Sequence, residues 1–598
     1  MRYKEQNAAL LEMRHPHLAP MLDETNPVII ETQTAKNGLP VFKYEGVAMH
    51  GAYKPDEEGA RLLAQIDQGV KNIIVFGLGY GHHLRDAVAA GLNVTVVEPS
   101  CAIFKSAVEN ADIGFVLEHC RIFVGKRGRR VLDAYDYRDA QIVAHRPYLR
   151  FFQVEYDKLE VSFITRKLVA GRKPRVMLAG PIYGGTETTF RYVKEALITL
   201  GADVTAFDAT AFKQGYFLMD EVTPNETHRH QLKSLYSNML GEAMVAMADD
   251  RKPDLILVMA QAPLDVGALA RLRQLNIPIA FWFVEDFRTL KYWDRVAPYY
   301  DYFFTIQRGE FHERLGKAGA RRVAYLPQAA APPHHKPLTL SPADKKMYGS
   351  DLSFMGAGYN NRRAFFSGVL DYDFKIWGTE WDLASAVGQR VANQNRRLQP
   401  EEYIKIFNAS KINLNLHSSV MNSGIDPMGD FVNPRVFELA ACGAFQLSDM
   451  RAELPALMQP GKEIETYASL EELREKIDHY LIHPEEREQI ARAGRERALE
   501  DHTFERRMED MLAVIFSREG ETFAIRQKGE GHGRNIVKNM IAEAAAKGNA
   551  ELAAFLKNFD PEEELSLKAV SDHINQGKGN LGRAESVFLM INELLVQK

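Results

Sequence analysis

At 598 residues the chain exceeds what one hydrophobic core usually supports, since single cores stop growing near about 250 to 300 residues, so we expect several domains. Hydrophobic residues make up 46% and charged residues 26%, which is typical of a globular protein and excludes a disordered chain. The formal net charge of -5 excludes a global field for nucleic acid, and we expect no nucleic-acid partner. The basic stretch KRGRR (126–130) is expected to be a solvated loop.

Cysteine usage and hydropathy predict the compartment. The three cysteines, Cys101, Cys120 and Cys442, are too scattered for a disulfide framework or a zinc site, which fits a reducing cytoplasm. Residues 1–20 lack the apolar core of a signal peptide, and apolar stretches such as IPIAFWFV (277–284) are too short to span a bilayer. We therefore predict a soluble, cytoplasmic protein without an integral membrane segment.

The first strand–turn–helix unit is NIIVFGLGYGHHLRDAVAAGLNVTVVEPS (72–100). An apolar run ends in glycines, a helix-like segment follows, and a second β-branched run ends at Glu98, which is typical of a Rossmann-like βαβ unit. A hairpin-like stretch (28–46) precedes it. These features predict an N-terminal Rossmann-like domain over 1–170.

Two further series of alternating strands and helices follow. The second series starts at residue 174 and ends near 328, before a Pro-rich linker (329–342); the third runs from 351 to about 516. We predict Rossmann-like domains over 171–335 and 345–517, with ligands bound in the cleft between the carboxyl ends of their strands. Short helical patterns predict an α-helical tail over 530–598.

The first turn of the third series, SFMGAGYNNRR, has the features of a phosphate site. Its strand ends at Gly356, Gly358 allows a close turn, and Arg362 follows at the start of a helix. A helix N-terminus offers N–H groups and a positive dipole end to phosphate, and arginine adds bidentate contacts. Many such turns carry Gly and Arg for structural reasons alone, so both interpretations stay open.

A second candidate site follows in VNPRVFELAACGAFQLSD (432–449). Asn433 and Pro434 have the pattern of a helix N-cap and first position, which places Glu438 in the early turns. A carboxylate there can accept two hydrogen bonds from the vicinal diol of a ribose. Asp430 precedes Glu438 with seven residues between them.

The stretch VNPRVFELAACGAFQLSD, with ELPALMQPGKEIETYASLEELREKIDHYL and the helical run after it, resembles the C-terminal domain of GT-B glycosyltransferases of the CgeB-like (spore maturation) group. The resemblance covers about 350–516 and implies a GT-B arrangement, with 174–330 as the acceptor-side domain. It implies that Glu438 holds the donor ribose and that neither a metal nor a cofactor beyond the nucleotide-sugar is needed. Asn433 and Arg435 are further candidates for the donor side of the cleft, although an arginine there could simply pair with a surface carboxylate.

Related retaining enzymes carry a Glu-x7-Glu pair whose first glutamate contacts the donor sugar. Here Asp430 stands in that place, which leaves the sugar contact and the retaining or inverting outcome open.

Five further positions are candidates on the cleft. Glu285 and Asp286 follow an apolar strand and could serve as the base for an acceptor hydroxyl, although Asp286 could equally cap the next helix. His417 ends a strand and is expected to face the same cleft. Gly184 and Gly185, in GPIYGGTETT, are expected to shape the acceptor-side loop.

The turn FGLGYGHH in the N-terminal domain, with Gly77, Gly79 and Gly81, is followed by Glu98 at the end of the next strand. This arrangement resembles motif one of S-adenosylmethionine-dependent methyltransferases and, with YKPDEEGARLLAQI (53–66), the Maf-type motility accessory proteins that glycosylate flagellin. A module for recognition only fits as well.

We therefore predict a glycosyltransferase whose partners are a nucleotide-sugar and a large acceptor, either a protein such as flagellin or a surface glycan. The alternatives are a methyltransferase or bifunctional enzyme through residues 73–98, and a non-catalytic GT-B scaffold.

Overall fold

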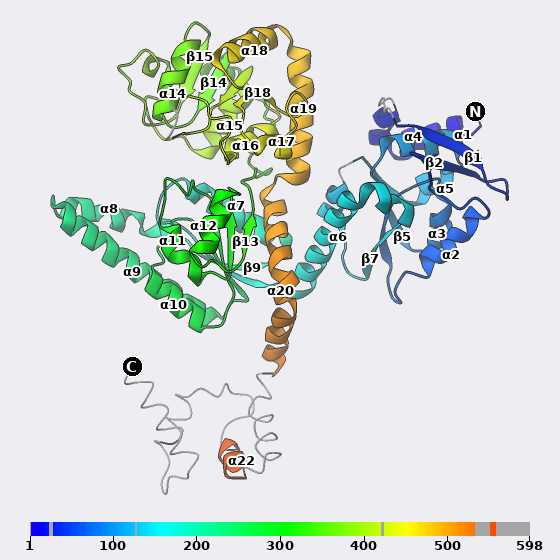
Figure 1. The fold of residues 1–598 in the computed structure, drawn as a ribbon, viewed down its shortest axis with the longest axis horizontal. Helices are drawn as coiled ribbons and strands as arrows, with labels where there is room; N and C mark the ends of the chain where they lie inside the picture. Colours follow the sequence, from blue (N-terminus) through cyan, green and yellow to red (C-terminus); the bar gives the residue numbers. More distant parts are fainter. Residues whose placement is uncertain are drawn as a thin grey trace. The chain divides into compact units, whose positions relative to one another are not determined.

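We describe a computed structural model of the protein, shown in Figure 1. It describes residues 2–22, 28–125, 128–419, 424–532, 550–557 and 574. The chain divides into two compact units, Met1–Ala513 and Val514–Lys598. All candidate site residues, and all the sheets within the described residues, belong to the first unit, which is described below.

The N-terminal region holds an antiparallel sheet and a parallel sheet. The hairpin is confirmed: β1 (Ile30–Thr34) pairs with β2 (Pro40–Tyr44), and β3 (Val47–Ala48) adds to β2. The parallel sheet has the order β6-β5-β4-β7, formed by β4 (Asn72–Phe76), β5 (Asn93–Glu98), β6 (Arg121–Val124) and β7 (Ala140–Ala144). Its α-helices are α1 (Arg2–Arg14), α2 (Glu58–Leu63), α3 (Arg85–Ala89), α4 (Cys101–Asn110), α5 (Gly114–His119) and α6 (Leu149–Arg172).

The middle region holds a six-stranded parallel sheet of order β13-β12-β11-β10-β8-β9. Its strands are β8 (Arg175–Ala179), β9 (Asp203–Phe207), β10 (Leu255–Met259), β11 (Ile279–Phe283), β12 (Tyr302–Thr305) and β13 (Val323–Tyr325). Every residue of β10 and β11 is buried, as expected for continuous apolar runs in a parallel sheet covered on both faces. Its helices are α7 (Thr186–Leu200), α8 (Lys213–Val222), α9 (Glu226–Arg251), α10 (Val266–Gln274), α11 (Trp293–Val296) and α12 (Glu310–Lys317).

The third region holds a five-stranded parallel sheet of order β15-β14-β16-β17-β18. Its strands are β14 (Leu352–Met355), β15 (Phe374–Trp377), β16 (Ile412–Asn415), β17 (Gln446–Asp449) and β18 (Glu465–Tyr467). Its helices are α13 (Pro342–Tyr348), α14 (Asn360–Phe365), α15 (Pro400–Ala409), α16 (Pro434–Ala441), α17 (Leu454–Leu457), α18 (Leu470–Ile482), α19 (Pro484–Asp501) and the start of α20 (Phe504–His532). The predicted α/β class with parallel sheets is confirmed.

The Pro-rich segment 329–342 connects the middle region to the third region, and its first residues are buried. Ala330 is fully buried, and its main chain bonds on both sides to the start of α20: its N–H donates to the carbonyl of His502 at 2.9 Å, and its carbonyl accepts from the N–H of Phe504 at 2.9 Å. A composition rich in alanine and proline predicts a connecting segment, and the small side chains of these residues also allow this close packing.

The expectation of a solvated loop over 126–130 is wrong for Arg129. Arg129 is buried, and its Nη2 lies 2.8 Å from Glu509 Oε1 and 2.8 Å from Asp510 Oδ1, so it connects the N-terminal region to α20. Local composition does not distinguish an arginine that pairs with carboxylates of a distant helix from an arginine that is exposed to solvent.

No helix within the described ranges is both long enough and apolar enough to cross a membrane. Of the tail predicted over 530–598, the structure describes the end of α20, α22 (Ala550–Leu556) and two further residues, and the rest lies outside the described residues.

Candidate active-site cleft

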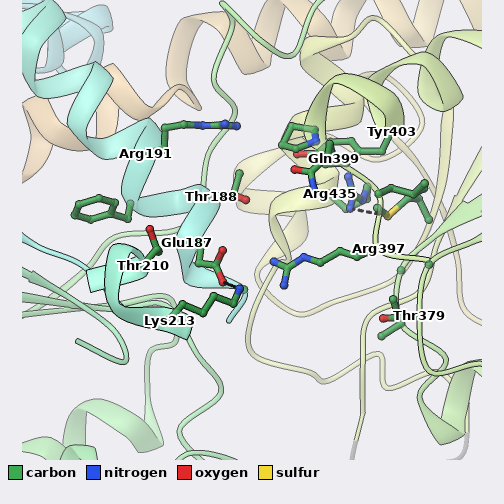
Figure 2. Close-up of a pocket in the computed structure, with 18 of the residues that line it drawn as sticks. Glu187, Thr188, Arg191, Thr210, Lys213, Thr379, Arg397, Gln399, Tyr403 and Arg435 are labelled. Atoms are coloured by element: carbon green, nitrogen blue, oxygen red, sulfur yellow. Dashed lines mark hydrogen bonds and ion pairs between the residues drawn. The ribbon is translucent and has the colours of Figure 1, made fainter. Parts of the chain in front are cut away.

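A cleft of about 780 Å³ lies between the middle region and the third region, at the carboxyl ends of their parallel strands (Figure 2). Its walls come from the loop and helix after β8, the segment around α8, the ends of β14 and β15, and the starts of α15 and α16. The lining residues are Gly185, Glu187, Thr188, Phe190, Arg191, Lys194, Asp208, Thr210, Lys213, Met355, Gly356, Ala357, Gly378, Thr379, Arg397, Leu398, Gln399, Pro400, Tyr403 and Arg435. The carboxyl edge of a parallel sheet is where α/β proteins bind ligands.

Three helices begin at this cleft. Gly185 is the N-cap of α7, Gln399 is the N-cap of α15, and Asn433, next to the lining residue Arg435, is the N-cap of α16. The side chain of Asn433 accepts a hydrogen bond from Val436 N, as predicted for an N-cap. Each helix N-terminus carries a partial positive charge, so the three together favour an anionic ligand.

Cationic side chains outnumber carboxylates in the lining, with Arg191, Lys194, Lys213, Arg397 and Arg435 against Glu187 and Asp208. Both carboxylates are engaged locally. Glu187 Oε1 lies 2.9 Å from Lys213 Nζ, and Asp208 accepts hydrogen bonds from Thr210. The remaining positive charge is available to a phosphate-bearing ligand.

Arg191 is the sharpest sign of such a ligand. Its Nε and Nη2 atoms are buried, and neither has a hydrogen-bond partner in the described part of the chain. Figure 2 shows its side chain extending across the cleft toward Gln399. Buried guanidinium N–H groups without acceptors are costly, so an anion that supplies acceptors would be bound favourably.

Arg191 was not among the residues predicted from the sequence, although a signal for it was present. Glu187, Arg191 and Lys194 stand at positions i, i+4 and i+7, so they share one face of α7, directly after the glycine loop. A polar face that starts at a strand–turn–helix junction marks a helix whose first turns border a ligand site. Lys213 and Arg397 lie outside regular periodic patterns and had no such signal.

Glu285 lies next to the start of α7. Thr186 Oγ1 donates a hydrogen bond of 3.2 Å to Glu285 Oε1, and the cleft-lining residues Gly185 and Glu187 flank Thr186. Burial raises the pKa of Glu285, and the charge of Asp286 adds to the rise, while the hydrogen bond from Thr186 opposes it. A half-buried carboxyl with a raised pKa is suited to accept a proton.

Asp286 serves a local turn. Its side chain accepts from the main-chain N–H of Arg288 at 2.9 Å, and its carbonyl accepts from Thr289 N and Leu290 N at 3.0 Å. Asp286 therefore caps a turn, as in the N-cap alternative, but it does not cap a helix, because α11 begins only at Trp293.

Asp430 bridges the two walls. Its carboxylate accepts from Arg288 Nη1 at 3.0 Å, from Arg288 Nη2 at 2.9 Å and from Gln307 Nε2 at 2.9 Å. Burial works to raise the pKa of Asp430, but these hydrogen bonds outweigh it and hold the pKa below its ordinary value. Asp430 is not among the residues that line the cleft, and a sugar contact would have to compete with Arg288.

Glu438 lies behind Arg435. Its carboxylate pairs with Arg435 Nη1, and its Oε1 lies 3.9 Å from Nε2 of the fully buried His335. Glu438 is buried and is itself absent from the cleft lining. In this structure it fixes the arginine that reaches the cleft, so the ribose contact remains a prediction.

His417 does not face the cleft, contrary to our expectation. Its side chain is buried, with Nδ1 2.6 Å from Asp449 Oδ1, while Nε2 accepts from the main-chain N–H of Asn433 at 3.0 Å. Because Nε2 accepts, Nδ1 carries the proton and donates it to Asp449. β16 ends at Asn415, so His417 lies just beyond the strand that it was predicted to end, and its side chain turns inward and holds the start of α16.

Arg362 is also turned inward. Its Nε donates to Leu416 O at 2.9 Å and its Nη1 to Ala357 O at 3.0 Å, and burial lowers its pKa to about 10. The guanidinium therefore holds the loop after β14, whereas Gly356 in that loop lines the cleft. A Cβ on Gly358 would lie 2.6 Å from Glu380 O, so this glycine allows the loop to pack closely.

On the opposite wall, Gly184 has φ +116°, and its N–H donates to Glu187 Oε1 at 2.9 Å. Its neighbour Gly185 lines the cleft, with open space where a Cβ would stand. The acceptor-side loop predicted from these glycines therefore borders the cleft.

The N-terminal glycine turn is filled by side chains of the protein itself. A Cβ on Gly77 (φ +102°) would lie 2.6 Å from the Tyr148 ring, and a Cβ on Gly79 (φ +51°) 2.4 Å from His50 Nε2. Gly81 (φ +77°) packs against Val116, which a Cβ would approach to 3.1 Å. The glycines thus admit protein side chains at the place where a ligand was predicted.

The carboxylate of Glu98 is likewise occupied. It accepts hydrogen bonds from Leu78 N and Ser100 N, both 2.9 Å, and from Tyr148 Oη at 2.5 Å. Burial raises the pKa of Glu98 to about 7 against these hydrogen bonds. A ribose at this position would have to displace Tyr148.

Comparison with known proteins defines the class of the third region. Residues 362–513 match the family model described as "Glycosyl transferase-like". This segment contains α15 and α16, and the family match includes Arg397, Tyr403 and Arg435 of the cleft. The fold and the match together define a glycosyltransferase-like domain.

The chain is similar to the spore protein CgeB of Bacillus subtilis (strain 168), with 26% identity over 268 residues that cover 42% of this chain and 80% of CgeB. The predicted resemblance to the CgeB-like group is thereby confirmed, and a glycosyltransferase function is supported. The resemblance of the N-terminal region to Maf-type proteins or methyltransferases remains a prediction.

Among solved structures, a sucrose-phosphate synthase from Thermosynechococcus elongatus superimposes with a TM-score of 0.39 at 12% identity, covering 59% of this chain and all of that one, 100%. The Anabaena protein HepE, solved in complex with UDP-glucose, superimposes with a TM-score of 0.40 at 12% identity, covering 57% of this chain and 99% of HepE.

Proposed function

We propose that this protein transfers a sugar from a nucleotide-sugar to a large acceptor, and that both substrates meet in the 780 Å³ cleft. The observation that carries the proposal is the unpaired positive charge of the cleft, where three helix N-termini and the guanidinium of Arg191 face one space. The glycosyl transferase-like match over 362–513 supports the same reaction.

The donor diphosphate is proposed to lie between Arg191 and Arg435. Arg435 is held by Glu438 and stacks at 4.7 Å on the Phe407 ring, so its guanidinium is positioned before a ligand arrives. Arg397 and Lys213 add positive charge on the same space. Fixed cations stabilise the charge that develops on a leaving diphosphate, which is the task that a metal ion performs in other transferases. We therefore propose a metal-independent transfer that needs no cofactor beyond the donor.

Glu285 is proposed as the base. The acceptor hydroxyl oxygen would form a bond to the anomeric carbon, the bond from that carbon to the diphosphate would break, and the hydroxyl proton would pass to the Glu285 carboxylate. Its raised pKa and its bond to Thr186, at the start of the cleft helix α7, support this role. Single displacement with a base inverts the anomeric configuration, whereas attack through Asp430 would retain it.

A macromolecular acceptor is supported by the helical hairpin of α8 and α9, which pack against each other beside the cleft residue Lys213 (Figure 1). Several large apolar side chains of the hairpin are exposed, among them Phe217, Leu218, Leu235 and Met239. Exposed large apolar side chains near a cleft are the kind of side chain that docks another macromolecule, which supports a large acceptor. Flagellin and surface glycans remain the acceptor classes that we propose.

Thermal shift measurements with UDP-, GDP-, CMP- and dTDP-sugars and with S-adenosylmethionine test the donor class. UDP-glucose is the first probe because HepE was solved with it. We expect stabilisation by at least one nucleotide-sugar, growing with its concentration as mass action requires. Stabilisation by S-adenosylmethionine alone would contradict the proposal. Stabilisation by a nucleotide-sugar without release of free nucleotide in the presence of acceptor would support the non-catalytic scaffold.

A further inference from the structure

A buried cluster of imidazole and carboxylate groups lies at the carboxyl edge of the N-terminal parallel sheet. His50 follows β3, Glu58 begins α2, His83 lies in the turn after β4, and His145 follows β7. Each of the four offers a potential ligand atom within 4.8 Å of those of the other three. The cluster takes no part in the cleft described above.

His83 has an orphaned nitrogen in this cluster. The side chain is 1% exposed, and its Nδ1 is buried with no hydrogen-bond partner in the described part of the chain. Its Nε2 lies 3.0 Å from the carbonyl of Gly77, which fixes the proton on Nε2 and leaves the Nδ1 lone pair free. An unpartnered lone pair in a buried polar cluster calls for an acceptor of electron pairs.

His145 is oriented in the same way. Its Nε2 lies 2.7 Å from the carbonyl of Met49, so Nδ1 again carries the lone pair, and its ring stacks on that of His83 at 4.1 Å. Histidine ligands of metals usually donate their second N–H to a carbonyl or carboxylate, which fixes the tautomer and the ring orientation. Both rings meet this condition.

His50 supports the carboxylate. The main-chain N–H of Tyr80 donates to His50 Nε2 at 2.8 Å, so Nδ1 of His50 carries the proton and donates to Glu58 Oε2 at 2.7 Å. The N–H of Gly51 donates to the other oxygen of Glu58 at 2.6 Å. His50 is thus a positioning residue that holds Glu58 toward the two remaining histidines.

We propose that Glu58, His83 and His145 bind one divalent transition-metal ion, with His50 as the positioning residue. Three atoms no more than 4.8 Å apart lie within about 2.8 Å of a common centre, about 0.7 Å beyond the roughly 2.1 Å of a Zn–N bond. Small side-chain rotations therefore complete the site. Two imidazoles and one carboxylate, without sulfur, are a ligand set for Zn²⁺, Fe²⁺ or Ni²⁺.

The bound ion would link three segments at the sheet edge, because its ligands come from the start of α2, from the 3-10 helix His82–Leu84 after β4, and from the residue that follows β7. Local sequence predicts no metal here, since the ligands are spread from residue 58 to residue 145 without a short motif. Glu58 has a side chain that is 13% exposed, which gives the ion a route from solvent.

Metal analysis of the full chain tests the proposal. The protein is purified without metal-affinity resin, stripped with a chelator and titrated with Zn²⁺ and, for its visible spectrum, with Co²⁺. We expect about one tight equivalent per chain, a Co²⁺ d–d spectrum, and a rise in the melting temperature with Zn²⁺. His83→Gln and His145→Gln should each abolish the tight equivalent, and His50→Gln should weaken it by about 10- to 100-fold.

Two controls separate this site from others. His82→Gln changes a buried neighbour whose Nε2 bonds to Pro40 O, outside the ligand set, and should keep the equivalent. His479→Gln removes a residue of the other candidate cluster in the described residues, which consists of the exposed His479 and Glu486 and the half-buried His483. Zn²⁺ binding that survives His83→Gln but not His479→Gln would overturn the proposal, as would the absence of any tight equivalent. If His83→Gln does not fold, Glu58→Gln provides the same test at a less buried position.

Discussion

Two glycine-bearing turns in this protein follow the same pattern and have opposite environments. The turn after β4 (Gly77 to Gly81) is filled by His50 and Tyr148, whereas the turn after β14 (Gly356 to Gly358) borders an open cleft of about 780 Å³. Both follow a parallel strand, and both are close-packed. A glycine turn therefore specifies how closely another group can approach, and not which group approaches.

The difference arises from segments distant in sequence. His50 and Tyr148 come from before and after the strand–turn–helix unit of β4 and β5, and they meet over its turn. At β14 the opposite wall is supplied by α7 and α8 of another region, and its side chains there are charged. Charged walls cannot close on each other without a counter-ion, so the cleft stays available to an anion.

The largest expected effect is on turnover at the open site. Glu285→Gln should lower the transfer rate by about 10²- to 10⁴-fold while donor binding is retained, because the carboxylate that accepts the proton is lost. In the unmodified enzyme the rate should rise with pH through the raised pKa of Glu285, since the base must be deprotonated. Released nucleotide is measured against pH.

Glu313→Gln, on the exposed face of α12, is the matched control and should leave the rate unchanged. Full activity of Glu285→Gln would exclude Glu285 as the base and leave Asp430 as the carboxylate to examine. An equal loss in Asp430→Asn with intact donor binding would favour the retaining route.

Donor affinity should depend on the cationic wall. Arg435→Ala should weaken UDP-glucose binding by about 10- to 100-fold in calorimetric titration, since a hydrogen bond to a charged group contributes about 1.5 to 3 kcal/mol. Arg492→Ala, on the exposed surface of α19, should have no effect. Unchanged affinity would show that the phosphate does not lie at the start of α16.

Glu438→Gln sharpens this result, because it keeps the side-chain volume of a buried position and removes the partner of Arg435. If Glu438→Gln lowers the affinity for the intact nucleotide-sugar but not the affinity for inorganic diphosphate, the result would favour a contact between Glu438 and the ribose. An equal loss for both would show that Glu438 acts through Arg435.

The two glycine turns can be compared directly by Gly79→Ala and Gly185→Ala. Gly79→Ala should destabilise the protein by about 1 to 3 kcal/mol. The new Cβ would clash with His50, and alanine rarely adopts the backbone φ of +51° that this position has. Gly185→Ala should leave stability unchanged, since its Cβ stands in open space, and should change only ligand binding. Calorimetry reports unfolding of the whole chain.

All four tryptophans lie between 282 and 381, so their fluorescence follows the cleft-forming regions and not the N-terminal region. If Gly79→Ala lowers the melting temperature equally in calorimetry and in tryptophan fluorescence, the N-terminal region and the cleft regions unfold together.

The smallest expected effect is the pH dependence that Glu98 confers. Its pKa is raised from 4.5 to about 7, so the folded state keeps a proton that the unfolded chain releases. The stabilising contribution is complete below the unfolded pKa and is lost as the pH rises to about 7, by up to about 1.4 kcal/mol per pH unit. The free energy of unfolding of the wild type minus that of Glu98→Gln should therefore decrease as the pH rises over this range. A constant difference from pH 4.5 to 7 would contradict this.

Glu285 and His417 show how far strand-end logic extends. Both were predicted at the carboxyl ends of parallel strands, where periodicity and apolar runs place residues well. The side chain of Glu285 lies at the start of α7, where it accepts a hydrogen bond from Thr186. The side chain of His417 instead hydrogen-bonds to Asp449, a buried carboxylate on the adjacent strand β17. The strand was readable from local pattern, and the partner was not.

Local periodicity, capping and motif order were enough to predict the three parallel sheets, the helix start at Asn433 and Pro434, and the resemblance to CgeB-like glycosyltransferases. Only the tertiary structure decided that Arg191, Arg397 and Arg435 share one cleft and that Arg362 is held by carbonyls. It also decided that the N-terminal turn is closed by His50. The physical reason is that unpaired charge and open space arise from the packing of distant segments, and a local pattern of residues carries no record of what will stand opposite it.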